Sequence, residues 1–258
     1  MAVGMTAEGN RESELTLALA AVRSRLALAA EAVGRNVGEI ELLPITKFFP
    51  ATDVAILSRL GCRSVGESRE QEASAKVAEL ARLADTSPRV DWREVHWHMV
   101  GQIQRNKARS LARWAHTAHS IDSTQLVTAL DRAVAAALAE GYRDNPLRVY
   151  VQVSLNGDTS RGGVDIRTPG AVDEVCAQVQ GSKCLELLGL MGIPPLAWDP
   201  DEAFDRLQSE HNRALESHPN AVGLSAGMSD DLEIAVKHGS TCVRVGTALL
   251  GPRRLPSP

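Results

Sequence analysis

The chain has 258 residues, of which 44% are hydrophobic and 23% charged, and its formal net charge at pH 7 is -4. This composition is ordinary for a globular protein and excludes disorder of the whole chain, since a chain of this length buries most of its apolar surface in a core. The negative balance provides no overall positive field, so we expect neither nucleic acid nor a membrane as a partner.

Cysteine usage indicates a reducing compartment. None of the cysteines has CxxC spacing, and they lie in or beside apolar segments, as buried free thiols do. They are Cys62, Cys176, Cys184 and Cys242. Neither zinc nor disulfides are indicated, and no apolar run reaches transmembrane length. We therefore expect the protein in the cytoplasm.

The first predicted element is a helix near the N-terminus. Its apolar stretch, Leu15 to Val22, resembles part of a signal peptide, but Glu12 and Glu14 stand where such a peptide carries positive charge. Arg23 and Arg25 then end the run. The stretch therefore predicts an amphipathic helix.

After this helix, short apolar segments alternate with segments of helical spacing. The candidate strands are residues 40–45, 63–66, 95–101, 118–121, 148–155, 184–193, 221–224 and 242–245. The helical segments between them are residues 53–60, 70–83, 106–114, 124–140, 169–180, 201–216 and 230–238. Such alternation indicates βαβ units and a parallel sheet. We expect one domain over residues 1–258, with loose ends at about 1–10 and 252–258.

The number of these units favours a closed barrel. Eight of them in a chain of this length predict a single (β/α)8 TIM barrel of the α/β class, preceded by an extra N-terminal helix. The alternative is an open, doubly wound sheet, but no G-x-G-x-x-G follows the first strand, where a dinucleotide site would lie. In a barrel the functional site lies at the C-terminal ends of the strands.

Lys47 follows the first strand at this expected mouth, between Ile45 and the aromatic pair Phe48 and Phe49. A lysine after a strand is usually a surface charge. An amine in apolar surroundings, however, loses its proton more readily and can attack an aldehyde. Both interpretations stay open from position alone.

Arg244 and the loop after it lie at the other end of the chain. Arg244 points to the strand face opposite its two valine neighbours, so it is either paired with a core carboxylate or aimed at a ligand. Gly246 and Thr247 then form a loop where barrels bind phosphate. Together with Lys47, these residues predict a site for a phosphorylated aldehyde, which points to pyridoxal phosphate.

The loop over residues 225–229 follows the seventh strand and has two interpretations. Ser225 lies at a barrel level that suits a phosphate contact. Ser229 and Asp230 are equally well explained as caps of the next helix.

His96 and His98 share one face of the third strand, with Trp97 on the other. A zinc pair is one alternative, but no third ligand with suitable spacing appears in the sequence, so we expect no metal. His98 is otherwise either a hydrogen-bonded barrel histidine or a contact of the cofactor ring.

In these segments the chain resembles the cytosolic pyridoxal phosphate homeostasis proteins, small barrels of fold type III related to the N-terminal barrel of alanine racemase. The matching segments are LPITK (43–47), GESREQE (66–72), WHMVGQIQRNK (97–107), HSIDS (119–123), GLMGI (189–193), LSAGMSDD (224–231) and GSTCVRVGT (239–247), with Gly251 after them. Their order and spread cover nearly the whole chain, so the match is specific.

The resemblance implies roles for individual residues. Lys47 corresponds to the Schiff-base lysine and Arg244 to the partner of the pyridine nitrogen, while the phosphate contacts correspond to Ser225, Gly246 and Thr247. With His98, the candidate cofactor-binding residues are Lys47, His98, Ser225, Arg244, Gly246 and Thr247.

Two positions depart from the family pattern. Ser68 stands where Asn is common, and its shorter side chain leaves open whether it reaches the cofactor. Arg161 stands where Lys is common and keeps the charge.

Two functional classes remain. Either the protein holds pyridoxal phosphate reversibly and hands it on without turnover, or it is a racemase or decarboxylase that uses the cofactor. A racemase of fold type III needs a second acid or base on the opposite face of the ring, supplied by a tyrosine of a separate β domain. The two tyrosines, Tyr142 and Tyr150, lie away from the expected mouth, and the chain ends soon after the eighth strand. The carrier is favoured, as a monomer with pyridoxal phosphate-dependent apo-enzymes as partners.

Overall fold

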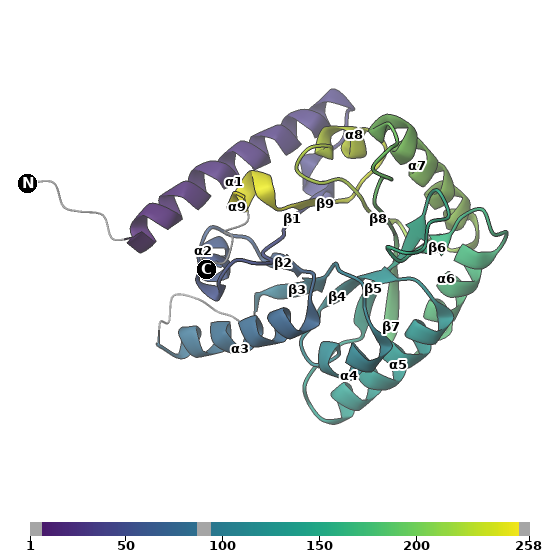
Figure 1. Cartoon of the computed structure of the whole chain (residues 1–258), viewed down its shortest axis with the longest axis horizontal. Coiled ribbons are helices and arrows are strands. Elements are labelled where there is room, and N and C mark those ends of the chain that lie inside the picture. The colour runs from purple at the N-terminus through teal and green to yellow at the C-terminus, as the bar shows by residue number, and fades with distance from the viewer. Residues whose placement is uncertain (1–6, 87–93, 253–258) are drawn as a thin grey trace, which may run out of the picture.

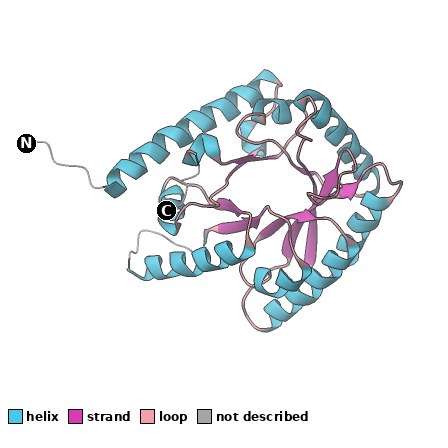
Figure 2. Ribbon diagram, viewed as in Figure 1, coloured by secondary structure: helices cyan, strands magenta, loops and turns pink. Residues whose placement is uncertain are grey.

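The computed structural model describes residues 7–86 and 94–252, and its strands form one parallel ring. The strands of the ring are β1 (Glu41–Pro44), β2 (Ser64–Glu67), β3 (His96–Met99), β4 (Thr117–Ile121), β5 (Leu147–Ser154), β7 (Leu185–Gly192), β8 (Gly223–Ser225) and β9 (Cys242–Val245). Their spatial order is β1, β9, β8, β7, β5, β4, β3, β2, and a parallel bridge between Ile45 and Gly66 joins β2 back to β1. Figure 2 shows the strands surrounding the barrel axis, which confirms the predicted (β/α)8 barrel.

Helices lie between successive strands of the ring, with α1 before β1 and α9 after β9, and they cover the outside of the ring (Figure 1). They are α1 (Ala7–Ala32), α2 (Ala51–Arg59), α3 (Glu70–Thr86), α4 (Ala108–Leu111), α5 (Thr124–Ala139), α6 (Ala171–Gly181), α7 (Pro200–Ser217), α8 (Leu232–Lys237) and α9 (Thr247–Leu250). The helix predicted over residues 106–114 is shorter in the structure, because the amides of Arg113 and Trp114 bond three residues back instead of four. Three short elements of the described chain were not predicted: α9, the 3-10 helix η1 (Val37–Glu39), and β6 (Val164–Asp165), which pairs with β5.

Side chains along each strand alternate between the helical layer and the barrel interior. On β9, Val243 and Val245 pack outward in a cluster with α1. Cys242 instead joins Leu43 of β1 in a small interior cluster. Arg244, two residues further along β9, lies on the same interior face. This alternation admits polar side chains to the interior, where they must find partners within the barrel.

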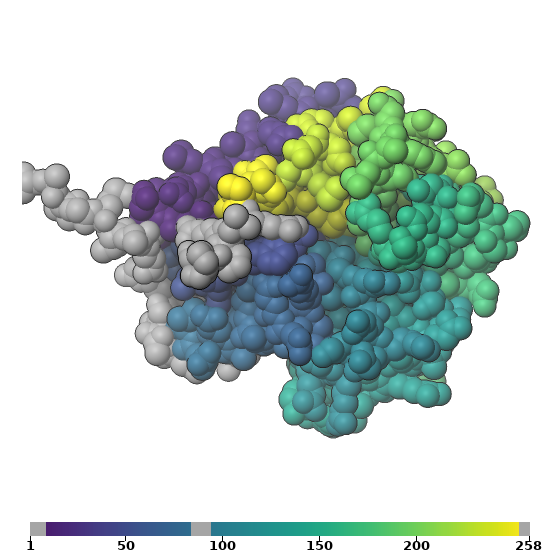
Figure 3. All heavy atoms as spheres, in the orientation of Figure 1, coloured from purple at the N-terminus to yellow at the C-terminus, as the bar shows by residue number. Residues whose placement is uncertain are grey.

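The N-terminal helix is confirmed, and it is longer than its predicted apolar stretch. Its buried positions, Leu15, Leu19, Val22 and Leu26, recur every three or four residues and are at most 3% exposed. They join a core cluster that includes Leu249 of α9. Figure 3 shows α1, in purple, lying beside the yellow C-terminal segment.

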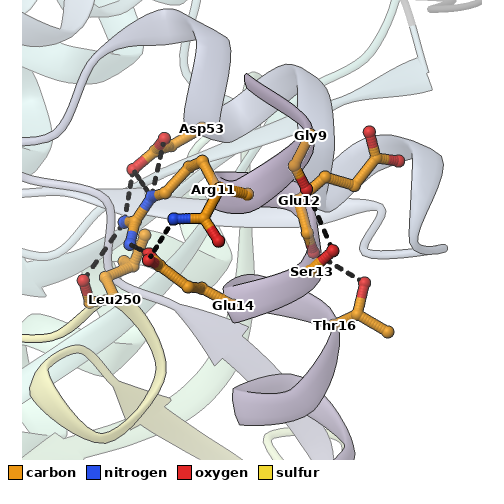
Figure 4. A network of polar contacts seen from close by, with 9 residues as sticks. Gly9, Arg11, Glu12, Ser13, Glu14, Thr16, Asp53 and Leu250 are labelled. Atoms are coloured by element: carbon orange, nitrogen blue, oxygen red, sulfur yellow. Dashed lines mark hydrogen bonds and ion pairs between the residues drawn. The ribbon is translucent and has the colours of Figure 1, made fainter. Parts of the chain in front are cut away.

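A partly buried ion pair fastens α1 to the barrel (Figure 4). Arg11 donates to the Asp53 carboxylate of α2, with its shortest N–O distance at 2.7 Å, and to the Leu250 carbonyl of α9 at 3.1 Å. Asp53 is 3% exposed, so Arg11 supplies the partner that a buried carboxylate requires. The Arg11 guanidinium also lies 5.7 Å from the centre of the Phe49 ring. Arg11 thus joins α1 to α2, the helix that follows the Lys47 loop, and to α9.

The ends that were expected to be loose fall largely on residues 1–6 and 253–258, outside the described residues, while α1 already begins at Ala7. Across the described ranges, no helix combines the length and apolar character needed to cross a lipid bilayer. All four cysteines are free thiols: Cys62, Cys176 and Cys242 are buried, and Cys184 is half-buried.

Candidate functional site

The loop after β1 carries Lys47 at the C-terminal mouth of the barrel. The two residues before it are anchored to both neighbouring strands. The Ile45 amide donates to the Val245 carbonyl of β9 at 2.9 Å, and the next amide donates to a β2 carbonyl at the same distance. Phe48, directly after Lys47, has a φ of 69°, in the left-handed region that aromatic residues rarely adopt.

A cavity of about 220 Å³ opens beside Lys47. Arg244 of β9 and the following Gly246 and Thr247 line it too, so the structure brings four of the six candidate residues into one wall. The other lining residues are Ile45, Phe48, Phe49, Met228, Ser229, Asp230 and Gly251. The aromatic rings supply the apolar neighbourhood expected for the lysine.

Arg244 lines this cavity as a buried cation with neutral partners. It is 5% exposed and donates to Ser225 Oγ at 2.7 Å and to the Gly192 carbonyl at 2.9 Å. Burial lowers the pKa of Arg244 from its ordinary value, yet a guanidinium stays protonated in proteins. Among the described residues no carboxylate pairs with it, so the alternative of a core ion pair does not hold. The cavity wall is therefore positively charged, which favours an anionic or hydrogen-bond-accepting ligand.

Ser225 lies beneath Arg244 and is not part of the cavity wall. It pairs in register with Cys242, two residues before Arg244, and its side chain is 0% exposed. Because the guanidinium can only donate, the Ser225 hydroxyl accepts from it and keeps its own proton for another partner. That partner is His119, whose Nδ1 lies 2.8 Å from Ser225 Oγ.

His98 continues this chain of hydrogen bonds deeper into the barrel. Its Nδ1 lies 2.9 Å from Nε2 of His119. If Ser225 donates to Nδ1 of His119, then the Nε2 proton of His119 is donated to His98, and both imidazoles are neutral with the proton on Nε2. The far end of the chain is Glu41, whose Oε1 lies 3.9 Å from His98 Nε2.

Burial keeps both histidines neutral. Desolvation is the main cause that lowers the pKa of His98 to about 4, and Glu41 offsets it only in part. Burial, together with the neighbouring His98 and Arg244, also lowers the pKa of His119 well below its ordinary value. Direct contact of His98 or Ser225 with a cofactor stays a prediction, because neither lines the cavity and their chain of hydrogen bonds leads to it through Arg244.

Ser229 links the two loops that flank the cavity. The expectation that it or Asp230 caps the next helix is wrong, because α8 begins at Leu232 and Asp231 occupies the cap position. Ser229 Oγ instead accepts from the Ala248 amide of α9 at 3.2 Å. Its hydroxyl therefore lies at the rim beside Thr247.

The zinc alternative for His96 has no geometric support. His96 is exposed, and its ring stacks on that of His116 with the ring centres 3.9 Å apart. Within the described part of the chain, no group of three potential ligands could hold a metal ion.

The sequence did not identify His119 as the residue that links His98 to Ser225. It placed the two tyrosines away from the mouth but did not give their surroundings. His119 is one of several buried polar residues on β4, a pattern that hints at an interior network. Tyr150 is buried with its ring centre 4.6 Å from that of His119, and Tyr142 is 52% exposed. Neither tyrosine lines the Lys47 cavity, and Ser68 lines a separate one.

Comparison with known proteins gives two consistent results. Residues 17–254 match the family described as alanine racemase, N-terminal domain. The chain is 78% identical to the pyridoxal phosphate homeostasis protein of Mycobacterium tuberculosis, over all 258 residues and all of that protein.

Solved structures agree with the fold. The structure of PipY from Synechococcus elongatus with PLP bound has a TM-score of 0.75 and 29% identity, and the match covers 92% of this chain and 100% of PipY. An alanine racemase from Clostridium difficile has a TM-score of 0.66 and 14% identity, covering 95% of this chain and 58% of the racemase, and it shows the shared fold alone.

Proposed function

The chain belongs to the pyridoxal phosphate homeostasis proteins within the alanine racemase N-terminal domain family, and we propose that it binds pyridoxal 5'-phosphate reversibly in the Lys47 cavity. The observation that carries this proposal is the shared wall of one cavity, which combines the Lys47 amine, the Arg244 cation and the Gly246–Thr247 loop. The PLP-bound structure of PipY supports the choice of ligand.

The residues present fit this ligand chemically. When bound, pyridoxal phosphate supplies an aldehyde carbon that is open to attack by a primary amine, and Lys47 is the amine in the cavity wall. The hydroxyls of Ser229 and Thr247 are the donors available to an anionic group. Arg244, which cannot give up its proton, is the donor suited to the ring nitrogen.

Arg244 also bears on whether the site is catalytic. A guanidinium leaves the ring nitrogen unprotonated, which weakens the ring as an acceptor of electrons from a substrate carbon. Inversion further needs proton donors on both faces of the ring. Tyr150 is enclosed in the barrel, and Tyr142 stands on the surface under Arg113, whose guanidinium carbon lies 4.2 Å from the ring centre. We therefore infer a carrier without turnover, with a racemase as the alternative.

The same proposal covers location and partners. We infer a cytoplasmic monomer that exchanges pyridoxal phosphate with dependent apo-enzymes. Mixing the loaded protein with such an apo-enzyme and following recovery of its activity tests the exchange. Sedimentation of the loaded protein tests the oligomeric state.

Borohydride trapping tests the ligand and its attachment point together. Purified protein is incubated with pyridoxal phosphate and reduced, and the labelled peptide is mapped by mass spectrometry. We expect the label on Lys47 and its loss in Lys47→Ala, with the fold retained by circular dichroism. Lys183→Ala is the matched control, because Lys183 is exposed between α6 and β7, at the opposite end of the barrel. Label on another lysine of the wild-type protein would refute the assignment.

A further inference from the structure

The residue after Lys47 adopts a costly backbone conformation. Phe48 has a φ of 69° and is the one non-glycine residue with positive φ among the residues that the structure describes. A bulky side chain rarely adopts this region, and such a conformation persists only where the surroundings enforce it. The conformation therefore calls for a specific stabilising contact.

That contact comes from α3. The Phe48 amide donates to Glu72 Oε1 at 2.6 Å, a short hydrogen bond to a charged acceptor. The Arg69 guanidinium also lies 5.4 Å from the centre of the Phe48 ring. Glu72 thus holds the peptide that follows Lys47.

The peptide before Lys47 is held by the same group of side chains. Lys76 Nζ donates to the Thr46 carbonyl at 2.9 Å and to Glu67 Oε1 at 2.6 Å. Thr46 Oγ1 donates to the same Glu67 oxygen at 2.6 Å. Glu72 Oε1 lies 3.7 Å from Lys76 Nζ, so the residue that holds the peptide after Lys47 is paired with the residue that holds the peptide before it. We call Glu67, Glu72 and Lys76 the carboxylate cluster.

Two members of the carboxylate cluster are enclosed, and the third lies at its edge. Glu67 is 0% exposed and Lys76 is 6% exposed, whereas the Glu72 side chain is 27% exposed. Burial raises the pKa of Glu67, although Lys76 and Thr46 oppose the shift. Charged groups in such a position are costly unless each bond between them is kept.

We propose that the carboxylate cluster positions Lys47, with Glu72 acting through the Phe48 peptide to keep the Lys47 amine in the cavity. The inference rests on the proposed function and adds a positioning interaction that sets how fast the Lys47 amine reacts with an aldehyde. Without Glu72, Phe48 is free to relax to negative φ, which rotates the peptide that links it to Lys47. Correct placement of a reacting group is a large part of its reactivity.

Three variants on one helix test this role. Glu72→Ala removes the acceptor, Glu72→Gln retains an acceptor oxygen, and Glu79→Ala removes an exposed carboxylate of α3 as the control. The first readout is the rate at which borohydride traps pyridoxal phosphate on Lys47. The second is the affinity for pyridoxine 5'-phosphate, which has the same phosphate and ring but no aldehyde.

We expect Glu72→Ala to slow trapping about tenfold or more, the scale of a lost hydrogen bond to a charged group. The trapping rates of Glu72→Gln and Glu79→Ala should stay within about threefold of the wild-type rate, because neither variant loses the hydrogen bond to the Phe48 amide. Affinity for pyridoxine 5'-phosphate should stay unchanged in all three. Unchanged trapping in Glu72→Ala, or a parallel loss of pyridoxine 5'-phosphate binding, would overturn the inference, since the second result means that the cavity itself has collapsed.

A double-mutant cycle with Phe48→Gly tests the route through the backbone. Glycine adopts positive φ without strain, so Glu72→Ala should slow trapping much less in the Phe48→Gly background. Equal slowing in both backgrounds would show that Glu72 does not act through this peptide. Failure of the wild-type protein to be labelled on Lys47 is a different result, which refutes the proposed function and not the positioning alone.

Discussion

Acid should destabilise this protein through His98, and the structure gives the size of the effect. The imidazole is 4% exposed, and its pKa is lowered from 6.5 to about 4 because burial disfavours the charged form. Between these two values the unfolded chain binds a proton that the folded chain does not, so stability falls as the pH falls through this window. From pH 7 to pH 5 the loss due to His98 alone is about 2 kcal/mol. Below the folded pKa the loss is complete.

Urea unfolding of the cofactor-free protein at pH 7 and pH 5 measures this loss. His98→Gln lacks the titrating group, so its free energy of unfolding should fall by about 2 kcal/mol less than that of the wild type over the same interval. The charged and titratable neighbours of His98 remain in both proteins; they are Glu41, His96, His116, His119 and Arg148. An NMR titration of the His98 ring supplies an independent value. A midpoint near 6.5, or equal acid losses in the two proteins, would refute the reasoning.

Three further outcomes are expected. Arg11→Met should lower the free energy of unfolding by about 2 kcal/mol, measured by urea denaturation, because it leaves the buried Asp53 carboxylate without its cation; no change would mean that Asp53 is neutral or solvated. Thr247→Phe should weaken binding of pyridoxal phosphate about tenfold more than binding of pyridoxal, by fluorescence titration, because it crowds the site of a charge-assisted phosphate contact; equal losses would remove the Gly246–Thr247 loop from the phosphate site. Alanine in heavy water should not exchange its Cα proton during incubation with stoichiometric loaded protein; NMR-detected exchange on the order of 1 s⁻¹, lost in Lys47→Ala, would establish a racemase-like enzyme instead.

The barrel architecture, and the positions of some of the site residues on it, follow from local properties of the sequence. Buried parallel strands and amphipathic helices differ in hydrophobic period, so their alternation predicts the barrel before any contact is known. Lys47 follows a strand end, and Arg244 lies between two valines on a strand, so both positions relative to the mouth and interior follow from the chain itself. Short elements such as β6 and α9 have too few residues to show a period.

Depth inside the barrel was decided only by the tertiary structure. Ser225 and Arg244 both belong to strand ends, but the stagger of β8 against β9 pairs Ser225 with Cys242 and sets it beneath the guanidinium. His98 likewise lies along the barrel interior, where its nearest ring partner is His119, 21 residues away in sequence. Strand stagger depends on how all the helices pack around the ring, and no single segment encodes it.

The same limit applies to the loop that carries Lys47. The sequence alone marks the lysine and its aromatic neighbours, but it does not show that Phe48 takes a positive φ or that its amide bonds to Glu72, 24 residues further along the chain. A local pattern records which face a side chain takes, because the backbone period fixes it. A local pattern does not predict which distant polar group a side chain or amide will bond to, because such pairs form only when packing brings their segments together.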